Sequence, residues 1–184
     1  DFLPIQGTDH IEFYVGNAKQ AALFYQHCMG FELVAYAGPE TGIRDRAPYV
    51  LQQNKIRFVL TTALHSDSEI AAHTQKHGDG VRVLALSVDD ARKSFYETTS
   101  RGAISAREPE ALKDEFGEVV IASIRTYGET LHTFVERKNY TGPFLPGYKP
   151  RKSPSPAIST GLKYVDHCVG NVELGRMNEW VRFY

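Results

Sequence analysis

The chain has 184 residues and a formal net charge of −1, with 21 Lys and Arg against 22 Asp and Glu. This length allows one or two domains, and a hydrophobic content of 42% is enough for a well-filled core. The balanced charge gives no field that favours nucleic acid or an anionic membrane, and no run approaches the roughly 20 apolar residues of a membrane span, so we expect neither partner. The two cysteines, Cys28 and Cys168, make no disulfide framework, and the first residues carry no signal-peptide pattern, so we expect a cytoplasmic protein.

The first part of the chain predicts a βαβββ unit. Residues 8–15 alternate apolar and polar positions, as in a half-buried strand. Asn17 then caps a helix over residues 18–29, and Gly30 supplies the stop. Three further strands follow, of which the last two form a hairpin, and we expect them at residues 31–36, 49–52 and 56–60.

The same order of elements returns after an exposed helix over residues 66–77. An apolar strand over residues 81–88 is followed by Asp89 as the expected N-cap of a helix over residues 90–100, which Gly102 ends. The three strands after this helix are expected near residues 104–108, 119–126 and 131–137. Two consecutive βαβββ units therefore predict an α+β domain.

A proline-rich segment over residues 139–156 separates this domain from the rest of the chain. Its prolines are Pro143, Pro146, Pro150, Pro154 and Pro156. Proline at this density resists both helix and central strand, so we expect an extended linker. Beyond it, a strand over residues 162–170 and a helix over residues 172–184 echo the start of the chain, and Val-Gly-Asn occurs at both turns, which predicts an internal repeat. No helix stop follows Tyr184, so we expect either a fragment or an incompletely recorded chain.

His167 lies on the strand expected after the linker. Side chains alternate along a strand, so His167, Val169 and Asn171 share one face, whereas Asp166 and Cys168 share the other. A lone histidine in such a place is more often a hydrogen-bonded residue of a half-buried strand than a metal ligand. The residues around His167 alone leave both interpretations open.

The register of the repeat decides whether His10 is a second copy of His167. Matching the two Asp-His pairs makes His10 that copy, whereas matching the two Val-Gly-Asn turns puts Phe13 opposite His167. The registers differ by an odd number of residues, which places His10 on opposite faces of its strand. The turn fixes where the strand ends, so we prefer the second register and expect His10 to be a structural or edge histidine.

Several motifs, met in order along nearly the whole chain, resemble the 4-hydroxyphenylpyruvate dioxygenase family. They are GNAKQAA (16–22), VAYAGPETG (34–42), HGDGV (77–81), YTGPFLPGY (140–148) and VDHCVGNVELGRMNEW (165–180). That family has the vicinal oxygen chelate, or glyoxalase-like, architecture, in which paired βαβββ units form open cupped barrels, with two such domains per subunit. The resemblance implies an N-terminal domain over residues 1–138, a linker over 139–160, and the start of a truncated catalytic domain over 161–184.

The resemblance also implies a cofactor. In the family the second domain holds a non-haem Fe(II) through two histidines and a glutamate, and His167 matches the first of these ligands. The other two are expected beyond Tyr184, so no further catalytic residue is expected within the chain, and the 184-residue fragment is expected to be inactive. The corresponding places in the first domain hold Phe13, Val83 and Thr133, so that domain is expected to be metal-free.

The activity implied is that of a dioxygenase of tyrosine and phenylalanine catabolism. It would convert 4-hydroxyphenylpyruvate and O2 into homogentisate and CO2, with the 2-oxo acid group of the substrate chelating the iron. Val169 would line the substrate pocket because it shares a face with His167, whereas Asn171 is expected to cap the helix that follows. The partners expected are this small-molecule substrate, O2, and further copies of the chain in a homo-oligomer.

Two other functions remain open. One is 4-hydroxymandelate synthase, a close relative of the family with the same substrate, metal and fold that oxidises the benzylic carbon instead of the ring. The residues expected to decide between the two products lie beyond the chain. The other is a non-catalytic fragment that acts as a binding or interaction module.

One further set of side chains has metal-ligand chemistry. Glu69, His73 and His77 stand at positions i, i+4 and i+8 of the helix over residues 66–77, on one face. The run lacks the glutamate of the zinc-protease motif, and the helix is expected to be solvated. We therefore expect no metal there.

Overall fold

The computed structural model describes residues 2–153 and 157–184. Its helices are α1 (Ala18–Met29), α2 (Glu69–His77), α3 (Ala91–Ser100) and α4 (Met177–Phe183), with a short 3-10 helix η1 (Pro39–Thr41). Its strands are β1 (Ile5–Tyr14), β2 (Glu32–Tyr36), β3 (Arg46–Gln53), β4 (Ile56–Ala63), β5 (Gly80–Val88), β6 (Ser105–Asp114), β7 (Gly117–Arg125), β8 (Leu131–Tyr140) and β9 (Lys149–Pro150).

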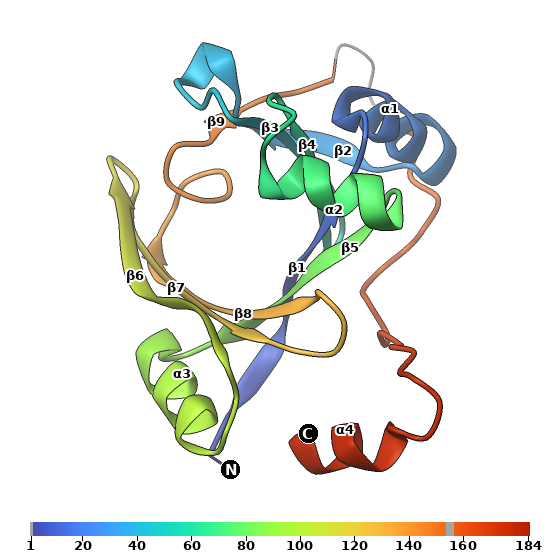
Figure 1. Cartoon of the computed structure of the whole chain (residues 1–184). Coiled ribbons are helices and arrows are strands. Elements are labelled where there is room, and N and C mark those ends of the chain that lie inside the picture. The colour runs from blue at the N-terminus through green and yellow to red at the C-terminus, as the bar shows by residue number, and fades with distance from the viewer. Residues whose placement is uncertain (1, 154–156) are drawn as a thin grey trace.

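Within the described residues, the nine strands form a single curled sheet in the order β6-β7-β8-β5-β1-β4-β3-β2-β9 (Figure 1). β1 pairs in parallel with β4, and β5 pairs in parallel with β8. The first unit therefore runs β1-β4-β3-β2 and the second runs β5-β8-β7-β6, and the two join through the antiparallel pair of β1 and β5. This arrangement confirms the predicted α+β class, with paired βαβββ units that form an open cupped barrel.

Local signals set the ends of the first helix where the sequence places them. The Asn17 side chain accepts a hydrogen bond from the Gln20 backbone N–H at 3.0 Å, and Gly30 ends α1 in the left-handed conformation at φ 73°. α3 differs by one residue from the prediction, because Asp90 and not Asp89 is its N-cap. The Asp90 carboxylate accepts from the Lys93 N–H at 2.8 Å, whereas Asp89 accepts a hydrogen bond from Gln6 of β1.

The core has an outer layer under each helix and an inner layer inside the cup. Phe31 and Leu60 belong to the cluster beneath α1, and Phe95 and Phe134 belong to the cluster between α3 and the second unit. The inner cluster is made by residues whose side chains point away from the helices, namely Val83, Ala85, Val119, Ile121 and Val135. Both faces of the sheet are thus buried, as the largely apolar strands β5 and β7 require.

Part of the proline-rich segment packs back onto the sheet. Phe144 is 2% exposed and belongs to a cluster with Ala35, Val50 and Val59. β9 adds two residues to the edge of the sheet by pairing with β2. Pro154 and Pro156 lie outside the described residues.

Residues 162–170 are not a strand, contrary to the sequence prediction. A strand is stable only when a neighbour satisfies its backbone hydrogen bonds. In the described part of the chain this segment makes isolated contacts instead: the Lys55 N–H donates to the Lys163 carbonyl at 2.9 Å, and the Asn54 amide donates to the Leu162 carbonyl at 2.6 Å. The helix expected over 172–184 is likewise shorter, because α4 begins at Met177.

A strap over residues 157–163 lies across the end of α1. Gln53, which is 5% exposed, is its anchor: its amide donates to the Met29 carbonyl at 2.7 Å, and its side-chain oxygen accepts from the Leu162 N–H at 3.1 Å. The backbone of Ile158 lies so near Gly30 that a Cβ on this glycine would overlap the Ile158 carbonyl oxygen. Glycine is therefore required at position 30 both by its positive φ and by this close approach.

A buried ionic network joins the two units inside the cup. The side chain of Asp9 is 3% exposed, and both of its oxygens accept from the Arg137 guanidinium, at 2.6 and 2.7 Å. His10 Nδ1 lies 2.6 Å from Asp9 Oδ1, and Arg137 also donates to the Phe144 carbonyl. Burial alone would raise the pKa of Asp9, but the hydrogen bonds from His10 and Arg137 outweigh it and hold that pKa well below its usual range.

We predict that Arg137→Met destabilises the fold by about 3–5 kcal/mol, because it leaves the Asp9 carboxylate buried without its main partner. Denaturant unfolding at neutral pH measures the loss. The control is Arg46→Met, which removes an ion pair between side chains 46% and 58% exposed and should cost about 0–1 kcal/mol.

The pH dependence gives a second check on this pair. Since the folded pKa of Asp9 is lowered, its contribution to stability is present above the ordinary value of 3.8 and is lost as the pH falls below it. The difference between wild type and Arg137→Met should therefore shrink in acid. A difference that stays constant from neutral pH to pH well below 3.8 would contradict the assignment.

Candidate functional site

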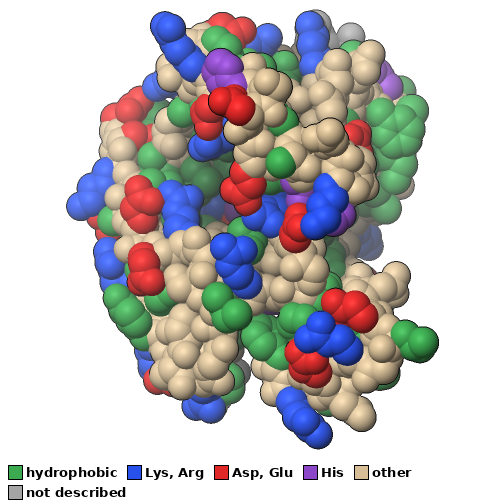
Figure 2. All heavy atoms as spheres, viewed as in Figure 1, with side chains coloured by type: hydrophobic (Ala, Val, Ile, Leu, Met, Phe, Trp, Pro, Cys, Tyr) green, Lys and Arg blue, Asp and Glu red, His purple; other side chains and the backbone are tan. Residues whose placement is uncertain are grey.

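A cavity of about 430 Å³ opens inside the cup, between β1, the start of α2 and the segment before β9. Figure 2 shows the hollow on this face, with acidic and basic side chains around its rim. Its wall includes Glu12, Tyr14 and Tyr148. Burial raises the pKa of Tyr14 to about 12 and also raises the pKa of Tyr148, so both phenols stay protonated at neutral pH and can only donate or accept hydrogen bonds. These features suit binding of a small molecule and supply no nucleophile.

The positions expected to correspond to metal ligands do not all face this cavity. Val83 packs in the inner cluster, and the Thr133 hydroxyl lies 2.8 Å from that of Ser123. Phe13 does not face inward, which is a correction: its ring packs against Tyr25 of α1 at 6.3 Å. Apolar residues of β1 that lie next to α1 face outward, toward the helix. The positions of β1 that face inward are His10 and the alternate residues after it.

His10 is a structural histidine, as expected. Its ring is 5% exposed, its Nδ1 is bound to Asp9, and its ring centre lies 5.0 Å from that of Phe144. The preferred register, which equates Phe13 with His167, stays a prediction, because residues 162–170 form no strand with which β1 can be compared. In the backbone register His10 lies opposite Ala85, and Ala85 lies opposite Thr133.

His167 and Val169 lie on the irregular segment before α4. The His167 side chain is 72% exposed, and its Nδ1 lies 2.7 Å from a carboxylate oxygen of Asp166. Val169 is 81% exposed. In the part of the chain that the structure describes, neither residue belongs to a group of three metal-ligand side chains.

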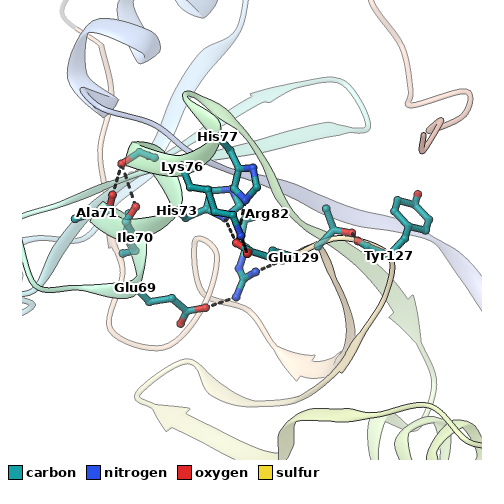
Figure 3. A network of polar contacts seen from close by, with 11 residues as sticks. Glu69, Ile70, Ala71, His73, Lys76, His77, Arg82, Tyr127 and Glu129 are labelled. Atoms are coloured by element: carbon teal, nitrogen blue, oxygen red, sulfur yellow. Dashed lines mark hydrogen bonds and ion pairs between the residues drawn. The ribbon is translucent and has the colours of Figure 1, made fainter. Parts of the chain in front are cut away.

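The structure does bring three such side chains together elsewhere, where the end of α2 meets the turn between β7 and β8 (Figure 3). His73, His77 and Glu129 place one ligand atom each within 4.8 Å of one another. His77 Nε2 lies 2.9 Å from Glu129 Oε2, and His73 Nδ1 lies 3.8 Å from the same oxygen. Lys76 donates to the other oxygen of Glu129.

Two sequence expectations about this helix are corrected. Glu69 is not part of the group, because its carboxylate binds Arg82, which also donates to the Glu129 carbonyl. The helix is not solvated all round either: His73 is 7% exposed and packs edge-on against the Tyr14 ring at 5.3 Å. Glu129 escaped prediction because it is 52 residues from His77 and lies in a turn that carries no signal of its own.

The charges of this group are set by their neighbours. Hydrogen bonds from Lys76 and then His77 lower the pKa of Glu129 to about 2. Burial, followed by the nearby His77, lowers the pKa of His73. At neutral pH the group therefore presents a carboxylate beside a neutral imidazole, and His73 Nδ1 has no hydrogen-bond partner within the described residues.

Comparison with known proteins identifies the family. Residues 2–144 match the family model described as "Hydroxyphenylpyruvate dioxygenase, HPPD, N-terminal". The chain belongs to this family. It is 42% identical to the 4-hydroxyphenylpyruvate dioxygenase of Aspergillus fumigatus, over 97% of the chain and 49% of that protein. It is 43% identical to the enzyme of the same name from Dictyostelium discoideum, over 98% of the chain and 51% of that protein.

Solved structures agree with the family assignment. A mutant of 4-hydroxymandelate synthase from Streptomyces coelicolor superposes with a TM-score of 0.81 at 28% identity, over 99% of this chain and 52% of that one. A methylmalonyl-CoA epimerase from the same organism superposes at 0.62 and 18% identity, over 76% of this chain, which shows a shared fold. The chain of this dioxygenase family thus spans about half the length of the curated relatives it matches. Its described helices include none long and apolar enough to cross a membrane.

We predict that the Glu129 carboxyl titrates with a pKa near 2, and that Lys76→Ala moves this pKa toward the ordinary value of 4.5, because the largest stabilising hydrogen bond is lost. Carbon-detected NMR of the glutamate carboxyls measures both values. The lowered pKa means that any stability from Glu129 is present above pH 4.5 and is lost as the pH falls toward 2. A Glu129 pKa that Lys76→Ala leaves unchanged would contradict the contact.

Proposed function

We propose that the chain is the N-terminal part of a 4-hydroxyphenylpyruvate dioxygenase, an oxidoreductase that converts 4-hydroxyphenylpyruvate and O2 into homogentisate and CO2. The observation that carries this proposal is an identity of 42–43% to proteins of that name over nearly all of the chain. The inferred setting is tyrosine and phenylalanine catabolism in the cytoplasm, in a homo-oligomer. Its substrates would be small molecules.

The iron expected of such an enzyme needs more ligands than the segment around His167, or the corresponding places of the first domain, provides. A facial triad takes two histidines and one carboxylate and leaves open positions for substrate and O2. Among the described residues, His167 has only Asp166 beside it, and Val83 and Thr133 of the first domain supply no imidazole or carboxylate. We therefore derive no catalytic step within this chain. We propose that His167 is one ligand and that the rest of the protein supplies the other two.

The proposed division of the chain follows from the same reasoning. Residues 1–138 would form a metal-free first domain, residues 139–160 a linker, and residues 161–184 the start of the catalytic domain. The side chain of Val169 is available to line a substrate pocket, since no described residue covers it. In the complete enzyme, the Fe(II) would supply activation of O2, and the protein around it would orient the aromatic ring and exclude water.

A second candidate activity is 4-hydroxymandelate synthesis. It is favoured by the superposition with 4-hydroxymandelate synthase over 99% of the chain. The identity to that structure is 28%, against 42% for the dioxygenase of Aspergillus fumigatus, so the dioxygenase is the better supported of the two.

We predict that the full-length protein carrying this sequence binds Fe(II) and consumes O2 when 4-hydroxyphenylpyruvate is added. His167→Ala should abolish both, because a triad with one ligand missing does not retain the metal. Iron content by mass spectrometry and O2 uptake with an electrode measure the two effects. The 184-residue chain alone should show no turnover.

The control and the product complete the test. His65→Ala removes an exposed histidine of the first domain and should leave iron content and turnover unchanged. Homogentisate as product supports the dioxygenase, whereas 4-hydroxymandelate would replace it with the second candidate. If His167→Ala kept wild-type iron content, the ligand assignment would be wrong.

A further inference from the structure

The group at the end of α2 has the chemistry of a second metal site, separate from the iron proposed above. We propose that His73, His77 and Glu129 bind a divalent transition-metal ion of the Zn²⁺ class, which fastens α2 to the β7–β8 turn. The proposal rests on the geometry of these side chains and stands whether or not the proposed function holds.

The donors converge from two elements that are distant in sequence. His73 and His77 are one helical turn apart on α2, the spacing with which helical histidine pairs hold Zn²⁺. Their ring centres lie 4.7 Å apart, and Glu129 faces both from the β7–β8 turn (Figure 3). Two ligand atoms on one ion with bonds of about 2.1 Å lie at most about 4 Å apart, so atoms within 4.8 Å need only a small closure.

One donor is already held in place without a partner. His73 is only 7% exposed. Its Nδ1 has no hydrogen bond within the described residues and lies 3.8 Å from Glu129 Oε2. An unpaired polar atom in such a place costs free energy. An ion between His73 and Glu129 would satisfy it. The lowered pKa of His73 also keeps its imidazole in the neutral form that metals bind.

Two cationic side chains, Arg82 and Lys76, border the site and affect how tightly Glu129 can bind a metal ion. Arg82 is occupied by Glu69 and by the Glu129 carbonyl, and it is buried, so it stays in place. Lys76 binds the Glu129 carboxylate, but its side chain is 63% exposed and can turn into solvent. A metal ion and the Lys76 ammonium therefore compete for the same carboxylate. Lys76 binds the Glu129 oxygen that the histidines do not face, so a metal ion at the other oxygen weakens this ion pair by charge repulsion.

The donor set indicates the class of ion. Two imidazoles and one carboxylate suit Zn²⁺, Ni²⁺, Cu²⁺ or Co²⁺ better than Mg²⁺ or Ca²⁺, which prefer oxygen ligands. Three protein ligands leave a position for water. The described residues place no nucleophile of the chain beside this water position. We therefore assign the metal ion a structural role, which is to join α2 to the β7–β8 turn.

The test is calorimetric titration of ZnCl2 into the 184-residue chain. Exposed donors elsewhere are removed first with Cys28→Ser, Cys168→Ser and His167→Ala. We expect one ion per chain in this background. Glu129→Gln and His77→Ala should each weaken binding by about 10-fold or more. Lys76→Met should strengthen it by about twofold to fivefold, because it removes the competing ion pair.

The Lys76→Met variant distinguishes a metal site from a cluster that only forms salt bridges. Zinc affinity should rise in this variant if the cluster binds zinc, whereas a cluster that only forms salt bridges gives no reason for such a rise. His27→Ala, an exposed histidine on α1, is the matched control and should leave affinity unchanged. His77 and Glu129 are both partly exposed, so these variants are expected to fold, which far-UV circular dichroism without metal checks. Two results would overturn the proposal. One is that the background chain binds no zinc; the other is that Glu129→Gln and His77→Ala bind zinc as tightly as the background chain does.

Discussion

The contact between Asp9 and Arg137 is the constraint on which the cup depends. It joins β1 of the first unit to β8 of the second across the intervening β5, so it fixes two strands that make no backbone hydrogen bonds with each other. The same guanidinium holds the Phe144 carbonyl, which seats the proline-rich segment inside the cup. A buried ion pair of this kind contributes little over an apolar pair but allows only one arrangement of its partners. The inner cavity therefore has a defined shape before any ligand enters it.

The second polar network, around Glu129, has the opposite character. The Asp9 side chain is 3% exposed and its partner Arg137 is 21% exposed, whereas Glu129 is 41% exposed and binds a lysine that is 63% exposed. The Asp9 network therefore keeps fixed partners, whereas the Glu129 carboxylate is accessible to the metal ion proposed above. Both join segments that are more than 50 residues apart, so each ties the two units together at a different place.

The parts of the fold that depend on local chemistry were predictable, and those that depend on packing were not. Asn17 and Gly30 delimit α1 by interactions within a few residues, and the repeated order of strand and helix follows from such signals. The inward or outward direction of Phe13 depends on where α1 lies, which periodicity alone does not contain. Glu129 joins His77 only through tertiary folding, and residues 162–170 lack the neighbouring strand that their composition favours.

Gly30 links the end of α1 to the strap over residues 157–163. It ends a helix of the first unit, and its missing side chain makes room for the backbone at Ile158, 128 positions later. A substitution there would disturb a surface helix only slightly by its own propensity, yet it would release the strap that leads toward His167. Variation at this position would therefore be felt in the placement of residues 157–184, so a change at the end of the first helix would act on a segment far along the chain.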